Sequence, residues 1–164
     1  MLHRERDRIA RILELGKTIP LDETERIGHW SRYACIACAG YIEVALRLVL
    51  TSHVQNKATR EICSYVVRDL DSIQNPKAEK FINTLRYFSD EWGREMDSFF
   101  LGNQQVKSAI DSLMSNRHLI AHGRTSSISL ARVTEYFSEA NKAIDFIDEM
   151  LNLPQIPKEK KTRT

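Results

Sequence analysis

The sequence is poor in the residues that interrupt helices. Its 164 residues include 6 glycines and 4 prolines, and no segment shows the sustained polar–apolar alternation of a β-strand. It also lacks a strong charge of one sign, with 24 Lys and Arg against 22 Asp and Glu. This near balance argues against a protein that coats duplex nucleic acid through bulk charge, although it allows a small basic cleft. With 42% hydrophobic and 28% charged residues, the composition is that of a globular protein.

Cysteine and targeting signals are scarce as well. The 3 cysteines form no disulfide framework, and Cys35 and Cys38 make a C-x-x-C pair without the second pair of a zinc site. We therefore expect buried, reduced thiols and a cytoplasmic protein. The N-terminus is charged at once and lacks the apolar run of a signal peptide. Glu43 and Arg47 interrupt the longest apolar stretch, 33–50, so we predict a core helix and no membrane span.

Helical periodicity predicts an all-α, up-and-down bundle of about six to seven helices with a long second helix. We expect one domain over residues 1–154, followed by a basic, disordered tail at 155–164. Asp22, with Glu25 completing a capping box, is predicted to begin the long helix, and Asn75-Pro76 a later one. The predicted helices cover about 2–15, 22–53, 58–73, 75–88, a short aromatic segment ending at Gly102, 103–121 and 129–153.

The helix predicted for 103–121 carries the side chains of greatest chemical interest. On a helical wheel Arg117 falls in the middle of the apolar face, where its permanent charge needs a partner or solvent. His118 and His122 are neighbours on a polar face. Arg117 and His122 lie roughly 140° apart on an ideal helix and about 7.5 Å along its axis. They converge only if the helix loosens near Gly123 or if a two-fold dimer completes the site, so we predict a composite site.

Each of these side chains also has a simpler interpretation. Arg117 could pair with an acid or a helix C-terminus inside the bundle, and His122 could interact with the last carbonyl groups of its own helix. His118 and His122 have the spacing of a metal-binding pair, but Asp111, the nearest further ligand, lies two turns away. We therefore predict no metal site.

Glu43 belongs to a polar stripe on the otherwise apolar second helix. It could hold Arg117 or His122 in place, or it could form a bridge with Arg47 four residues later. The pattern supports both interpretations equally. The other members of this stripe are His29, Arg32 and Gly40.

The run from Asn116 to Gly123, NRHLIAHG, resembles the signature of HEPN domains, which is an Arg, a polar residue, three further residues and a His at a helix end. The run from Arg32 to Arg47 is similar to the long second helix of the RiboL-PSP-HEPN and MAE_28990-like branch. The order of elements agrees, because the motif lies on the penultimate long helix. This resemblance, over about residues 19–153, implies a helical bundle that forms a homodimer.

The resemblance also implies a metal-independent endoribonuclease without a cofactor, which leaves a 2′,3′-cyclic phosphate and a 5′-OH. In such a reaction the 2′-OH of the RNA is the nucleophile, and His122 is general base or acid, since imidazole titrates near neutral pH. Arg117 binds the scissile phosphate and stabilises the charge of its transition state. His118 orients the phosphate or the second His, with Asn116 in support.

Many proteins of this kind are bacterial toxins or phage-defence effectors. The expected partners are therefore RNA, a second copy of the chain and an antitoxin or other partner protein. The alternative is a non-catalytic HEPN-like module that dimerises and binds a nucleotide or a protein. The sequence does not decide between the two functions, because activity depends on the site and not on the fold.

Overall fold

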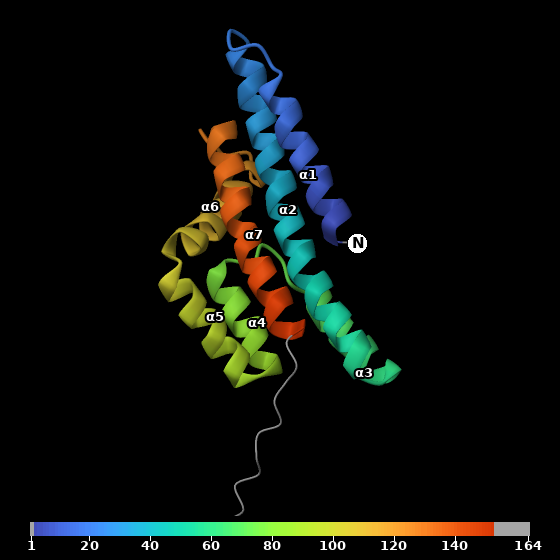
Figure 1. Cartoon of the computed structure of the whole chain (residues 1–164). Helices are drawn as coiled ribbons and strands as arrows, with labels where there is room; N and C mark the ends of the chain where they lie inside the picture. Colours follow the sequence, from blue (N-terminus) through green and yellow to red (C-terminus); the bar gives the residue numbers. More distant parts are fainter. Residues whose placement is uncertain (1, 153–164) are drawn as a thin grey trace, which may run out of the picture.

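The computed structural model describes residues 2–152, so the predicted tail, 155–164, lies outside that range. Within 2–152 the chain forms seven α-helices and no strand, which confirms the predicted all-α bundle with a long second helix (Figure 1). The helices are α1 (Leu2–Lys17), α2 (Thr24–Lys57), α3 (Arg60–Asp71), α4 (Ala78–Phe88), α5 (Asp90–Gly102), α6 (Gln104–Ala121) and α7 (Leu130–Asn152).

The long helix α2 is the centre of the bundle, and it packs against α1, α3, α6 and α7. By length and composition it is also apolar enough to cross a membrane. However, 56% of its most apolar window is buried inside the bundle. Its apolar face is thus covered by other helices, as expected for the core helix that the sequence predicts.

Polar contacts that are buried or partly buried tie α1 and α7 to the middle of α2. Arg6 of α1 donates to the Tyr41 hydroxyl at 3.1 Å and forms a salt bridge with Asp145 of α7. Tyr41 in turn donates to the side-chain oxygen of Asn141 at 3.0 Å. Because Tyr41 and Asn141 are buried, these bonds satisfy groups that would otherwise be costly to remove from water.

The helices α2 and α7 run in the same direction. Trp30 and Leu130, near their starts, both lie against Gly16 of α1. Further along, Tyr41 contacts Asn141. The starts of α2 and α7 therefore lie at the same end of the molecule, which is the upper end in Figure 1.

The start of α2 differs from the prediction. The capping box of Asp22 and Glu25 is wrong, because α2 begins at Thr24 after Glu23 and no side chain caps it. The preceding turn is the reason: the Glu23 N–H donates to the Pro20 carbonyl at 3.0 Å. Asp22 is held inside this turn and cannot act as the residue that begins the helix.

The start of α4 also differs from the prediction. Asn75-Pro76 does not begin the helix, which starts at Ala78. Asn75 has a φ of 48°, in the left-handed region, and its N–H donates to the Glu43 carboxylate of α2 at 2.7 Å. The Ala78 N–H donates to the Asp111 carboxylate of α6 at 2.9 Å. Carboxylates of two distant helices thus satisfy N–H groups for which the sequence suggested a local cap.

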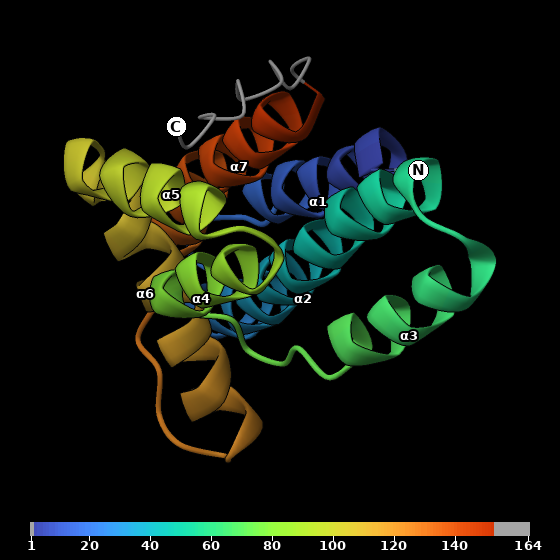
Figure 2. The same cartoon turned by 90° about the horizontal axis from the view of Figure 1, so that it is seen from below.

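The remaining differences are small. Helix α3 packs chiefly against α2 and extends from the rest of the bundle (Figure 2). Helix α5 is regular where the sequence predicted a short aromatic segment, because Met96 and Phe100 are buried on one of its faces. Two further helices and the end of α2 differ from the predicted ranges: α1 ends at 17, α3 spans 60–71, and α2 ends at 57.

Candidate active site

Helix α6 carries the motif beyond the part that packs in the core. Val106, Ile110 and Leu113 are fully buried, and the Cys35 thiol of α2 lies 3.9 Å from the Leu113 carbonyl oxygen. After Met114 the side chains of α6 are half-buried or exposed. In Figure 2 the last turns of α6 and the loop that follows project away from the other helices. The motif is thus presented to solvent by a helix that is anchored at its other end.

A glycine cap ends α6 at Ala121, which is the end predicted for this helix. Gly123 has a φ of +66°, which favours glycine over residues with a side chain. Its N–H donates to the Ile120 carbonyl at 3.0 Å, and the Arg124 N–H donates to the Leu119 carbonyl at 2.9 Å. These two bonds define a Schellman motif. The cap turns the chain back toward α7 along residues 122–129, the return loop.

The helix does not loosen before this cap. The His122 N–H still donates to the His118 carbonyl at 3.2 Å, so helical geometry continues up to His122. Among residues 2–152 no hydrogen bond joins the side chains of Arg117 and His122. The first of the two routes to convergence, a loosened helix, is therefore absent, and the composite site stays a prediction.

The structure does bring the two histidines together. The His118 and His122 rings lie 4.4 Å apart between centroids, and both side chains are exposed. Arg117 is half-buried, and within the described chain its guanidinium makes no hydrogen bond or salt bridge. The described residues therefore do not support the simpler interpretation, in which Arg117 pairs with an acid inside the bundle. A guanidinium without an internal partner remains available to bind a phosphate.

Asn116 holds the return loop against α6. Its side-chain nitrogen donates to the Ser112 carbonyl at 2.9 Å, and its oxygen accepts from the Ser126 hydroxyl at 2.8 Å. Ser126 is buried and also lies 3.5 Å from the Ile128 nitrogen. Asn116 therefore positions the segment next to the motif. Ser126 was missed by the sequence analysis, because nothing local marks this serine among the polar residues of the loop.

Glu43 follows neither of the two predicted interpretations. Its carboxylate accepts from the Asn75 backbone, while Arg47 forms its salt bridge with Asp71 at 3.4 Å. The structure therefore places Glu43 on the connection between α3 and α4. Any effect that it has on the motif is indirect.

Metal or thiol chemistry has little structural basis in the described residues. Among residues 2–152 no group of three His, Cys, Asp or Glu side chains is placed to hold a metal ion. Cys35 and Cys38 are buried free thiols. Burial raises the pKa of Cys35 to about 11, and burial together with Cys35 raises the pKa of Cys38 further. Both thiols are therefore protonated and unreactive near neutral pH.

Comparison with known proteins agrees with this arrangement. A family model described as RiboL-PSP-HEPN matches residues 3–153. No curated protein and no solved structure gives a significant match. The match spans all seven helices, including the motif at the end of α6. The chain therefore belongs to the RiboL-PSP-HEPN family.

Proposed function

We propose that this protein is a metal-independent endoribonuclease that leaves a 2′,3′-cyclic phosphate and a 5′-OH. The observation that carries the proposal is the end of α6. There Arg117, which has no hydrogen-bond or salt-bridge partner among residues 2–152, precedes two exposed imidazoles in mutual contact. Membership of a HEPN family supports the same function.

The residues supply what this reaction needs. The 2′-oxygen of the RNA attacks the adjacent phosphorus, and the bond from phosphorus to the 5′-oxygen breaks. His122 takes the proton of the 2′-OH or gives one to the leaving 5′-oxygen, because an imidazole can act as a general base or a general acid. Arg117 binds the phosphate and stabilises its additional negative charge. His118 orients the phosphate or the second imidazole.

We further propose that the site is shared between two copies of the chain. Arg117 and His122 lie on different sides of a regular helix, so one copy alone does not direct both at the same phosphate. A two-fold dimer in which the ends of α6 face each other would bring Arg117 of one copy to His122 of the other. Two such sites would form in each dimer.

We propose that the protein is a toxin or phage-defence effector that acts on RNA in the cytoplasm. An antitoxin or another partner protein would restrain it. Three free cysteines, two of them buried, are compatible with a reducing compartment. The alternative, a dimeric module that binds without cleaving, gives the opposite result in the following test.

The test is incubation of the purified protein with a labelled structured RNA in EDTA. We expect cleavage to cyclic-phosphate ends, with a loss of at least about 100-fold in Arg117→Ala and in His122→Ala. Arg68→Ala on α3 and His3→Ala on α1 are matched controls on exposed positions away from the motif. No cleavage of several RNAs by the wild type, or full activity in either motif variant, would contradict the proposal.

A further inference from the structure

The helix α2 has an open face between α1 and α6. Its edges are marked by Trp30, which donates its indole N–H to the Ile12 carbonyl of α1 at 3.1 Å, and by Cys35, which contacts α6. At 100° per residue, the exposed side chains between these edges are ordered across the face. From α6 toward α1 they are Glu25, Ile36, His29, Tyr33 and Arg26, and the half-buried Arg32 lies between Glu25 and α6. Arg32 and His29 thus lie toward the motif helix, and the aromatic rings lie toward α1.

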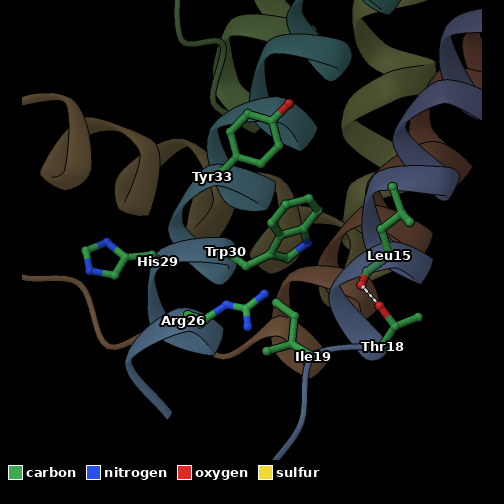
Figure 3. Close-up of a pocket in the computed structure, with 7 residues that line it drawn as sticks. All are labelled: Leu15, Thr18, Ile19, Arg26, His29, Trp30 and Tyr33. Carbon is green, nitrogen blue, oxygen red and sulfur yellow. Dashed lines mark hydrogen bonds between the residues drawn. The ribbon is translucent and has the colours of Figure 1, made fainter. Parts of the chain in front are cut away.

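The aromatic side of this face is hollowed. A groove with a volume of about 630 Å³ lies between the end of α1 and the start of α2, a size typical of small-ligand sites. Figure 3 shows Trp30 directed toward α1 and His29 directed away from it, toward the side on which α6 lies. We call this feature the α1–α2 groove. Its lining residues are Leu15, Thr18, Ile19, Arg26, His29, Trp30 and Tyr33.

Trp30 forms a rigid wall of the groove. Its ring packs so closely on Gly16 that a Cβ atom there would lie 2.4 Å from the ring and 2.7 Å from Leu130. The Tyr33 ring lies 5.5 Å from the Trp30 ring, and Tyr33 is 51% exposed. One aromatic surface is therefore fixed, and a second one is open to solvent beside it.

The groove lies close to the motif. Leu130, which packs beside Trp30 on Gly16, is the first residue after the return loop. Cys35 of α2 contacts Leu113 of α6. Trp30 precedes Cys35 by about 7.5 Å along the axis of α2, and Arg117 follows Leu113 by about 6 Å along the axis of α6. The groove and the motif are thus connected both by the return loop and by this contact between α2 and α6.

The position of the cations on the face, and not its net charge, favours a nucleic acid, because Glu23 and Glu25 balance Arg26 and Arg32. Arg32 and His29, joined by a hydrogen bond of 3.0 Å, lie between the motif and the aromatic rings, where a strand would place a phosphate. Two carboxylates oppose them in part: Glu25 lies 3.7 Å from His29, and Glu23 pairs with Arg26. Aromatic rings beside such cations are the usual means of holding unpaired bases.

We propose that the α1–α2 groove binds one unpaired base of the RNA next to the scissile phosphate, with the base against Tyr33 and Trp30. This inference rests on the proposed ribonuclease function. Arg32 and His29 contact the phosphate that connects this base to the motif. The groove thus selects single-stranded RNA, because a paired base cannot enter it.

The test uses Trp30 as its own probe. In a Trp92→Phe background Trp30 is the one remaining tryptophan, and a 2′-O-methyl oligonucleotide lacks the nucleophile and cannot be cleaved. We expect saturable quenching of Trp30 fluorescence by the single strand and none by the duplex. Tyr33→Ala should weaken binding about tenfold and raise KM more than it lowers kcat. Tyr65→Ala, a matched control at a tyrosine of α3 that is 76% exposed, should change neither.

The outcomes separate this inference from the proposed function. RNA cleavage with equal KM values in Tyr33→Ala and Tyr65→Ala would overturn the base subsite and leave the ribonuclease standing. Quenching by the single strand without cleavage in EDTA would overturn the ribonuclease and leave the subsite standing. If Tyr33→Ala dissociates a dimer in sedimentation experiments but leaves RNA binding unchanged, Tyr33 belongs to a protein interface. That result would overturn the subsite.

Discussion

Arg117 lies on the helix face that carries the core residues of α6, yet no acid neutralises it among residues 2–152. Arg6, by contrast, is held by Tyr41 and Asp145. A half-buried charge without a partner loses hydration and gains nothing inside the chain. Such a residue lowers stability, which is a common property of functional sites.

Replacement of this arginine by an apolar side chain of similar length should reveal that cost. We expect Arg117→Met to abolish RNA cleavage and to raise the free energy of unfolding by up to about 1 kcal/mol, or a few degrees in Tm. Activity assays and thermal melts of the same preparation measure both effects. A clear fall in Tm would indicate a structural arginine and favour the non-catalytic module.

At the scale of elements, the cap of α6 determines where the motif ends. Gly123 has a positive φ, but a Cβ atom there would meet nothing within 4 Å. We expect Gly123→Ala to cost about 1 kcal/mol through backbone strain alone and to impair cleavage by displacing His122. Gly102→Ala is the matched control, since Gly102 ends α5 in equally open space without a positive φ. Equal melting temperatures for the two variants would contradict this account.

The helix boundaries that the sequence predicted correctly are those set by local chemistry. Gly123 ends α6, and the Ser129 hydroxyl accepts from the Arg132 N–H at the start of α7. The boundaries that failed have two causes: a local turn from Pro20 to Glu23 moves the start of α2, whereas the start of α4 depends on distant groups. Asn75 was expected to cap α4, but Glu43 and a second carboxylate from α6 hold that segment, and no local pattern reveals such contacts.

The candidate site divides in the same way. The motif on α6 could be identified from spacing and family resemblance, and its contact between His118 and His122 follows from their separation by one helical turn. The hydrogen bond from Ser126 to Asn116 and the groove beside Trp30 depend on how the return loop and α1 pack. Side-chain partners across tertiary contacts are not encoded in any single segment.

At the scale of the whole molecule, the groove, the return loop and the starts of α2 and α7 gather at one end (Figure 1). The polar network of Arg6, Tyr41 and Asn141 lies further along the bundle and fixes its framework. The exposed end of α6 is thus supported by a rigid base but has no second helix end facing it within the described chain. A second copy of the chain can supply that missing face.

Two kinds of heterodimer, each purified with two different tags, test the shared site. In the first, Arg117→Ala is paired with His122→Ala. If Arg117 of one copy works with His122 of the other, one of the two sites is intact, and about half of the wild-type activity should return. In the second, wild type is paired with the double variant, and both shared sites then lack a residue, so activity should vanish. A site built within one copy would give the reverse: an inactive first heterodimer and a second with about half of the activity.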